Sequence, residues 1–161
     1  GFCYGYKNET EKDADGYDLY QPIWKVDCNE PSYRKDKEGK KIPYATPPGP
    51  SELIGTPVLY KGKAYCAIGQ DPEHGDGVGR LSCIDASTGE VIWKYTDVGR
   101  TISTVSIADD LVYLAEYAGI IHCIDANTGK VYWTHDSFSR IWGSTLVVDG
   151  KLVLGLSLIH I

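Results

Sequence analysis

The stretch GRLSCIDASTGEVIW at residues 79–93 returns 40 residues later as GIIHCIDANTGKVYW at residues 119–133. Nine of the fifteen paired positions are identical: Gly, Cys, Ile, Asp, Ala, Thr, Gly, Val and Trp. Short β-branched and aromatic runs separated by Gly, Asn and Asp are typical of strands joined by hairpin turns. A repeat of about 40 residues built from such strands is typical of one blade of a β-propeller.

The repeat extends beyond this stretch in both directions. Residues 102–109 align with residues 142–149, and residues 54–59 align with the same segment one unit earlier, at a step of 48 residues. The eight extra residues are best placed at 70–77. Tight turns are expected at Lys61-Gly62, Asp109-Asp110 and Asp149-Gly150. We therefore predict an all-β chain, a partial β-propeller of four-stranded antiparallel blades, with two full blades plus parts of two others in an open arc.

The repeat also divides the chain. We expect the end of a degenerate preceding blade and a long loop rich in Pro and charge at 1–53, a blade with the inserted hairpin loop 70–77 at 54–96, a second blade at 97–136, the first half of a further blade at 137–155, and a non-native tail at 156–161. Within the first segment, residues 1–15 are expected to be irregular and frayed. Trp24 is assigned to the last strand of its blade, and residues 27–53 to an exposed loop.

The end of the chain departs from the pattern. After Gly155 the repeat predicts a polar turn and a third strand, but the sequence continues LSLIHI. One frame of a common transposase sequencing adapter encodes this hexapeptide, and a genuine apolar strand is the alternative. The absence of methionine and of an apolar signal segment is expected if the chain is a fragment of a longer protein.

The Asp-x-x-Thr-Gly turn has a physical explanation. The aspartate can accept hydrogen bonds from backbone amides two or three residues ahead, and the glycine can take a positive φ without steric cost. The tryptophan that follows offers a large apolar surface for packing against a neighbouring blade. We assign these repeated positions a structural role: Asp85, Thr88, Gly89, Trp93, Asp125, Thr128, Gly129 and Trp133.

Composition excludes several classes of protein. The net charge is −6 and the Lys and Arg residues are scattered, so no basic stripe indicates a nucleic-acid partner. No apolar run approaches the roughly 18 residues that a membrane-spanning helix needs. Of the five cysteines, Cys66, Cys83 and Cys123 are expected in the core, whereas Cys3 and Cys28 lie in irregular segments where they could form a disulfide.

The insertion is the most unusual local feature. Asp71, Glu73, His74 and Asp76 bring three carboxylates and an imidazole into one loop, and such ligands suit Ca²⁺ or a transition metal. Their spacing matches no EF-hand or zinc pattern, so a hairpin extension with solvated charges is the favoured interpretation. No catalytic residue is assigned, because the sequence contains no nucleophile elbow, phosphate loop or Ser/His/Asp spacing.

Three arginines recur near blade edges: Arg80, Arg100 and Arg140. Arg100 and Arg140 stand one repeat apart, each just before a first strand. They could line one end of the channel and attract an anionic ligand, or they could form salt bridges between blades. His122, whose counterpart in the previous blade is Ser82, is interpreted as a residue on a strand face.

The motif Ile-Asp-Ala-x-Thr-Gly-x-x-x-Trp resembles the pyrroloquinoline quinone (PQQ) enzyme repeat, over roughly residues 54–155. Related propellers include the quinoprotein alcohol dehydrogenases and the bacterial outer-membrane-protein assembly lipoprotein. The resemblance to the dehydrogenases would imply a cofactor over the propeller axis, a calcium or lanthanide ion, a catalytic Asp and a disulfide between adjacent cysteines. This chain has no Cys-Cys pair, and none of its carboxylates can be matched to the metal ligands or the base, so the resemblance implies the fold alone.

The favoured function is a non-catalytic β-propeller repeat module of an exported bacterial protein, which mediates protein or ligand interaction in the periplasm, cell envelope or extracellular space. Its expected partners are other blades or domains of a longer chain and a protein partner. The alternative is a fragment of a PQQ-dependent alcohol or sugar dehydrogenase, with PQQ and Ca²⁺ held by blades outside this sequence. A metal or redox sensor built on the His74 loop is a third class.

Overall fold

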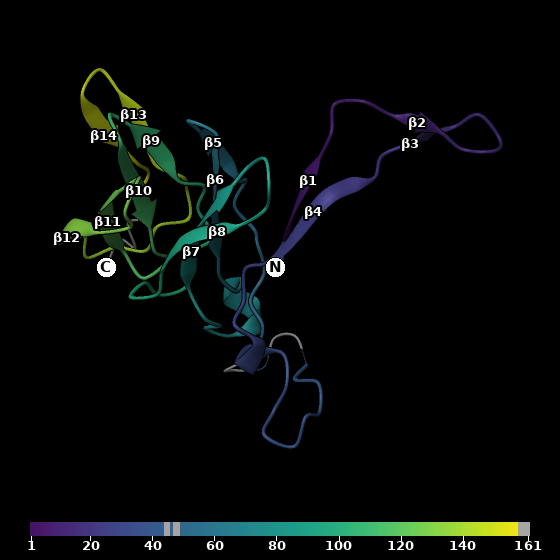
Figure 1. The fold of residues 1–161 in the computed structure, drawn as a ribbon. Coiled ribbons are helices and arrows are strands. Elements are labelled where there is room, and N and C mark those ends of the chain that lie inside the picture. Colours follow the sequence, from purple (N-terminus) through teal and green to yellow (C-terminus); the bar gives the residue numbers. More distant parts are fainter. Residues whose placement is uncertain (44–45, 47–48, 158–161) are drawn as a thin grey trace.

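The computed structural model describes residues 1–43, 46 and 49–157, which form antiparallel sheets (Figure 1). The strands are β1 (Phe2–Tyr6), β2 (Glu11–Lys12), β3 (Asp18–Leu19), β4 (Pro22–Asp27), β5 (Val58–Tyr60), β6 (Lys63–Ile68), β7 (Arg80–Asp85), β8 (Val91–Tyr95), β9 (Ser106–Ala108), β10 (Leu111–Ala115), β11 (Ile120–Asp125), β12 (Val131–Asp136), β13 (Leu146–Val148) and β14 (Lys151–Val153). Two 3-10 turns, η1 (Pro31–Tyr33) and η2 (Pro72–His74), complete the regular structure of this part of the chain.

Two four-stranded meanders form the centre of the structure. Strands β5 to β8 make the first sheet and β9 to β12 the second, each strand pairing with its neighbour in sequence. The hairpin β13–β14 follows the second sheet, and β9 contacts β13. The predicted all-β class with four-stranded antiparallel sheets is confirmed, and over the described residues the sheets stand side by side without closing into a ring (Figure 1).

The tight turns follow from residues that tolerate positive φ. Lys61 and Gly62 have φ of 48° and 75°, and Asp109 and Asp110 have φ of 51° and 61°. Two consecutive left-handed residues make the hairpin turn whose twist matches that of the flanking strands. These turns therefore set the register in which β5 pairs with β6 and β9 with β10.

In the Asp-x-x-Thr-Gly turn, the aspartate side chain organises the backbone. Asp125 Oδ1 accepts hydrogen bonds from the backbone N–H groups of Asn127 at 2.9 Å and Thr128 at 2.8 Å, and Asp85 accepts the equivalent pair. The Tyr132 hydroxyl and these turn residues lower the pKa of Asp125 to about 2. The repeated aspartate thus closes the turn between the third and fourth strands of each sheet.

Each Asp-x-x-Thr-Gly turn is contacted by the tryptophan at the end of the preceding sheet. Trp24 Nε1 donates to the Ala86 carbonyl at 2.9 Å, and Trp93 Nε1 donates to the Ala126 carbonyl at 3.2 Å. A Cβ at Gly129, whose φ is +75°, would lie 2.8 Å from the Trp93 ring. Glycine is therefore needed here twice over, for the backbone conformation and for the approach of the indole.

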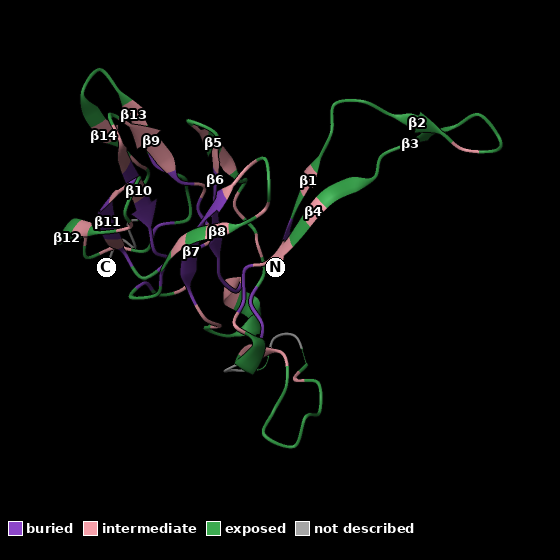
Figure 2. Ribbon diagram, viewed as in Figure 1, coloured by how far each residue is buried: buried purple, intermediate pink, exposed green. Residues whose placement is uncertain are grey.

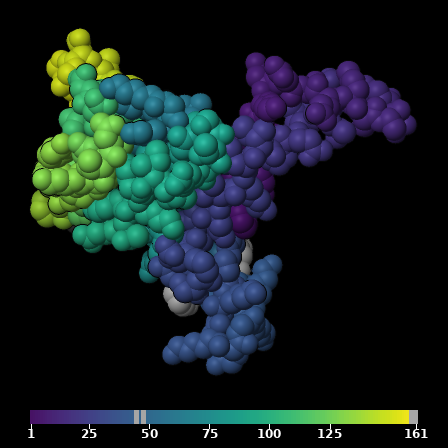
Figure 3. All heavy atoms as spheres, in the orientation of Figure 1, coloured from purple at the N-terminus to yellow at the C-terminus, as the bar shows by residue number. Residues whose placement is uncertain are grey.

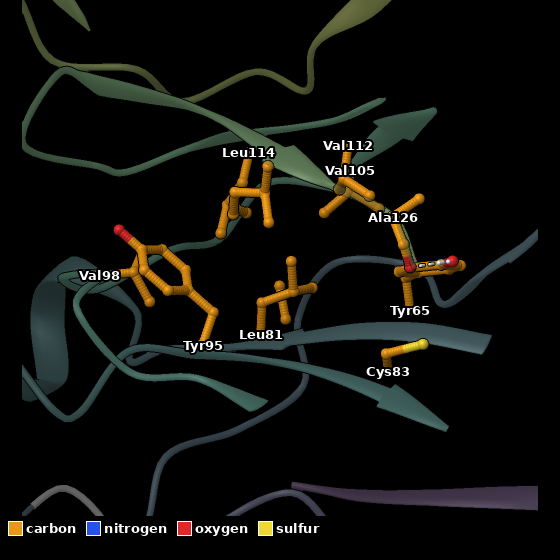
Figure 4. Packing of buried hydrophobic residues seen from close by; sticks show 11 residues of the cluster. Tyr65, Leu81, Cys83, Tyr95, Val98, Val105, Val112, Leu114 and Ala126 are labelled. Carbon is orange, nitrogen blue, oxygen red and sulfur yellow. Dashed lines mark hydrogen bonds between the residues drawn. The ribbon is translucent and has the colours of Figure 1, made fainter. Parts of the chain in front are cut away.

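The cores lie between sheets. The largest cluster joins the first and second sheets, with Leu81 and Tyr95 facing Val112 and Leu114 (Figure 4). Tyr65 packs edge-on against Trp93 and donates its hydroxyl proton to the Ala126 carbonyl at 2.9 Å. Burial is accordingly concentrated on the middle strands, as Figure 2 shows for β6, β7 and β10.

The N-terminal residues form an ordered ribbon. Strand β1 pairs with β4, with Gly5 opposite Trp24, and β2 pairs with β3 farther along the same projecting ribbon (Figure 3). The expectation that residues 1–15 are irregular and frayed was wrong at β1. The aromatic residues at 2, 4 and 6 alternate as they do in a strand, and this pattern predicts β1.

The long loop at 27–53 is exposed along most of its length, as expected, but its ends are buried. Asn29 Nδ2 donates to the Ser51 carbonyl at 2.9 Å, and Ser51 N donates to Asn29 Oδ1 at 2.8 Å. Arg80, only 1% exposed, forms an ion pair with Glu30 at 2.8 Å and donates to the Cys28 carbonyl at 3.1 Å. These contacts join the two ends of the loop to each other and form a clamp, in which Arg80 holds the loop to the first sheet.

Two further expectations concern the tail and the cysteines. Of the predicted tail at 156–161, residues 158–161 lie outside the described residues, and Ser157 N donates to the Arg140 carbonyl at 2.9 Å. All five cysteines are buried free thiols, so the disulfide between Cys3 and Cys28 is not formed in this structure.

The contact between indole and turn makes a prediction about stability. Replacing Trp93 with Ala should lower the free energy of unfolding by about 2–4 kcal/mol, because the change empties part of the core between the two sheets. Trp133→Ala is the matched control: Trp133 stands at the same strand position but is 44% exposed, so its loss should cost less than about 1 kcal/mol. Urea unfolding of the two variants measures both values, and equal losses would contradict the assignment.

Candidate functional site: an arginine–aromatic cluster on the loop face

The charged side chains of the insertion at 70–77, which follows β6, do not converge on one site. Asp71 caps η2 by accepting from the backbone N–H of Glu73, and its other oxygen lies 2.6 Å from His74 Nδ1. Asp76 points toward Arg100 at 3.8 Å and is 94% exposed. No group of three or more His, Cys, Asp or Glu side chains among the described residues could hold a metal ion. The metal assignment for Asp71, Glu73, His74 and Asp76 stays a prediction.

The three arginines that recur in the sequence lie in two different environments. Arg80 is buried in the clamp described above, whereas Arg100 and Arg140 lie in the links that lead from one sheet to the next. Backbone hydrogen bonds bring these two links to the turn between β10 and β11. Tyr117 N donates to the Arg100 carbonyl at 2.9 Å, and Ile141 N donates to the Tyr117 carbonyl at 3.2 Å.

These three loops place two guanidinium groups on one aromatic ring. The Arg100 guanidinium carbon lies 4.3 Å from the centre of the Tyr117 ring, and that of Arg140 lies 5.4 Å from it. Arg140 also donates to the Tyr117 hydroxyl at 3.2 Å, and Trp142 meets Tyr117 edge-on with ring centres 5.0 Å apart. We call Arg100, Tyr117, Arg140 and Trp142 the arginine–aromatic cluster.

The side chains of the cluster differ in their exposure and in the contacts that fix them. Tyr117 is buried, whereas Trp142 is 53% exposed. Arg100 is fixed further by donating to the Gly75 carbonyl at 2.6 Å, which ties the insertion to the cluster. A guanidinium over an aromatic face is held by the ring quadrupole and keeps its donors free for other partners.

A buried hydrogen-bonded chain lies beside the cluster. His122, only 3% exposed, contacts the Tyr95 hydroxyl through Nδ1 at 3.0 Å and Glu116 Oε1 through Nε2 at 2.8 Å. Glu116 also accepts from the backbone N–H of Gly99 at 2.7 Å. A Cβ at Gly99 would lie 2.7 Å from Glu116 Oε2, so glycine leaves the room that this carboxylate occupies.

The surroundings of this chain shift two pKa values. Burial raises the pKa of Tyr95 to about 12, with smaller contributions from Asp97 and Glu116. Burial would also raise the pKa of Glu116, but the His122 and Gly99 hydrogen bonds overcome it and hold the pKa below its usual value of 4.5. Glu116 is therefore a carboxylate at neutral pH, positioned by three elements of the fold.

A cavity of about 280 Å³ opens between the insertion and the turn after β10. Arg100, Glu116 and Tyr117 line it together with Gly77 and Gly99. Two members of the arginine–aromatic cluster, Arg100 and Tyr117, therefore lie at the same cavity as the buried Glu116 carboxylate. Such an arrangement can bind charged or polar groups, and it brings no nucleophile and base together among the residues that line the cavity.

Sheet order, repeated indole contacts and the loop face together define a segment of a β-propeller. The family model described as outer membrane protein assembly factor BamB, a PQQ-repeat model, matches residues 21–157. The chain belongs to this family. No curated protein sequence matches it at a significant level.

Solved structures support the same architecture. The quinohemoprotein alcohol dehydrogenase from Comamonas testosteroni is 25% identical, with a TM-score of 0.54, over 66% of this chain and 17% of that protein. BamB from Moraxella catarrhalis is 22% identical, with a TM-score of 0.51, over 64% of this chain and 30% of that protein. A europium-containing methanol dehydrogenase is 22% identical, with a TM-score of 0.51, over 66% of this chain and 22% of that protein. The chain thus spans less than a third of each.

Part of this site is predicted by the sequence. The repeat puts Arg100 and Arg140 at equivalent positions, whereas no sequence pattern marks Tyr117, Trp142 or Glu116 as site residues. His122 was interpreted as a residue on a strand face. Glu116 and His122 flank the β10–β11 turn at Gly119. The register pairs His122 with Leu114, so Glu116, two residues farther along, is its diagonal neighbour, and this spacing of an acidic residue and a histidine around a hairpin was the signal that could have linked them.

The lowered pKa of Glu116 predicts how stability depends on pH. Its ionisation stabilises the folded state fully above pH 4.5, its unfolded value, and this contribution is lost as the pH falls through the lower folded value. The free energy of unfolding should therefore fall more steeply between pH 6 and about pH 3 in the parent protein than in Glu116→Gln. Denaturant titrations across this range measure the difference, and parallel curves would contradict it.

Proposed function

We propose that this chain is a non-catalytic β-propeller module that docks an acidic segment of another envelope protein through the arginine–aromatic cluster. The observation that carries the proposal is the placement of two guanidinium groups on the Tyr117 ring beside an exposed Trp142. Arg, Tyr and Trp are the residue types that contribute most to binding at protein interfaces. Their convergence at one place on the surface favours recognition of a protein.

The counterparts of Trp142 in the earlier units are partly accessible. Ile54, two units earlier, is 43% exposed, and Ile102, one unit earlier, is half-buried. A tryptophan at an exposed repeat position supplies a large apolar surface at a place where packing within the fold does not require one. This favours a role outside the fold.

The charge of the cluster favours an acidic partner. In the described part of the chain no carboxylate forms an ion pair with Arg140, although the protein as a whole carries a net charge of −6. Because the arginines are already held against Tyr117, less side-chain entropy is lost when they bind. Bidentate recognition of a carboxylate by the exposed Arg140 would fix the register of the bound segment, whereas Arg100 already contacts Asp76 and the Gly75 carbonyl.

The family description supports a location and a kind of partner. The family is described as an outer membrane protein assembly factor, so we propose an envelope location and a partner within the assembly machinery. No helix among the residues described is long and apolar enough to cross a membrane. We further propose that residues 54–96, 97–136 and 137–155 belong to three consecutive blades, that residues 1–53 contain the end of the preceding one, and that residues 156–161 are a non-native tail.

The alternative function is a fragment of a PQQ-dependent dehydrogenase. The observation that favours it is the 25% identity to a quinohemoprotein alcohol dehydrogenase over 66% of this chain. On this hypothesis the cofactor and its Ca²⁺ would be held by blades outside these residues. The two hypotheses share the fold and differ in whether the full-length protein binds quinone.

Binding to purified outer-membrane assembly proteins of the same organism tests the first proposal. In the full-length protein, Trp142→Ala and Arg140→Gln should each weaken binding about tenfold or more, and raising the salt concentration should weaken the parent complex. Tyr132→Ala and Lys151→Gln, exposed residues outside the cluster, are the matched controls. Equal affinity of all variants would contradict the role of the cluster.

Quinone binding distinguishes the alternative. We expect the full-length protein, incubated with PQQ and Ca²⁺, to show neither a bound quinone absorbance nor dye-linked oxidation of alcohols or sugars. Dye-linked turnover that depends on PQQ would overturn the non-catalytic proposal and establish the dehydrogenase one.

A further inference from the structure

Three thiols from separate segments share one buried cluster. Cys3 lies on β1, Cys28 follows β4, and Cys66 lies on β6, and all three pack in the core between the N-terminal ribbon and the first sheet. Cys66 is fully buried in this cluster, and hydrogen bonding to its thiol lowers the pKa of both Cys3 and Cys28. The other two cysteines pack away from this cluster, Cys83 in the core between the two large sheets.

One of the three thiols is reached from outside the core. A cavity of about 300 Å³ is lined by Cys3, Gly5, Trp24 and Ala64, between the ribbon and the first sheet. Cys28 and Cys66 do not line this cavity. A reagent that enters it therefore meets Cys3 and neither of the other two thiols of the cluster.

The pKa values of the thiols also favour Cys3 as the first to react. The hydrogen bond from Cys66 lowers the pKa of Cys3 to about 7, against the opposing effect of burial. Hydrogen bonding to Cys28 and Cys3, together with burial, raises the pKa of Cys66, so Cys66 keeps its proton. The pKa of Cys28 is lowered as well, but Cys28 does not line the cavity. Since the thiolate is the nucleophile in disulfide exchange, Cys3 is the attacking group.

We propose that Cys3 and Cys66 form a disulfide bond when a low-molecular-weight disulfide enters the Cys3 cavity. This inference is independent of the proposed docking function. It assigns an oxidisable thiol pair that fastens β1 to β6, and thereby the N-terminal ribbon to the first four-stranded sheet.

The chemistry balances in two exchange steps. The Cys3 thiolate attacks one sulfur of the oxidant disulfide, and a mixed disulfide forms as the first oxidant thiolate leaves. Cys66 then gives up its proton and attacks Cys3 Sγ, so that the Cys3–Cys66 bond forms and the second oxidant thiolate leaves. Two protein thiols are oxidised and one oxidant disulfide is reduced to two thiols, with the two protons taken up by the leaving thiolates.

Glutathione disulfide is the probe for the test. The reduced chain is incubated with it at about pH 7.5, its thiols are blocked, and disulfide-linked tryptic peptides are identified by mass spectrometry. Cys3, Cys28 and Cys66 fall in separate tryptic peptides, 1–7, 26–34 and 64–80, so each pairing is distinguishable. We expect the link between peptides 1–7 and 64–80, and three of the five thiols remaining free.

Variants and stability complete the test. Cys3→Ser and Cys66→Ser should abolish the link, whereas Cys28→Ser and the buried control Cys83→Ser should retain it. The oxidised parent should melt about 5 °C or more above its reduced form, because the bond closes a long loop. Five free thiols in the parent protein, or a link that joins Cys28 to either partner in place of Cys3 to Cys66, would overturn the proposal, whatever the folding of the variants.

Discussion

The structure depends on the contact between a tryptophan at the end of one sheet and the Asp-x-x-Thr-Gly turn of the next. Trp24 reaches the Ala86 carbonyl and Trp93 reaches the Ala126 carbonyl, at 2.9 and 3.2 Å. Because the indole must pass over the glycine of the turn, each contact fixes both the spacing and the angle between neighbouring sheets. Repeating one contact at each boundary produces an arc of sheets, since every sheet takes the same relation to the next.

The arc in turn determines what lies on the loop face. Links between sheets and the turns after second strands emerge on the same side, so equivalent residues of successive units become neighbours. Arg100 and Arg140 meet on Tyr117 for this reason, although 40 residues separate them. The fold thus supplies the placement, and the particular side chains at these positions supply the chemistry.

The sequence alone predicted the fold well because its repeated features are local. Asp85 and Gly89 make a turn by interactions within five residues, and the spacing of Trp93 and Trp133 reveals the repeat. The site was predicted poorly because its contacts are not local. Trp142 stands where the aligned units have isoleucine, so no repeat pattern marks it. The ribbon strand β1 was missed because its pairing partner β4 lies about 20 residues away, beyond the short hairpin β2–β3.

Hydrogen exchange of the indole N–H groups, followed by NMR, tests the central contact most directly. The chain has four tryptophans, at 24, 93, 133 and 142, so each indole signal can be assigned by single substitution. The account predicts slow exchange for Trp24 and Trp93, whose N–H groups are bonded to turn carbonyls, and fast exchange for the exposed indoles of Trp133 and Trp142. Equally fast exchange at all four indoles would contradict the account.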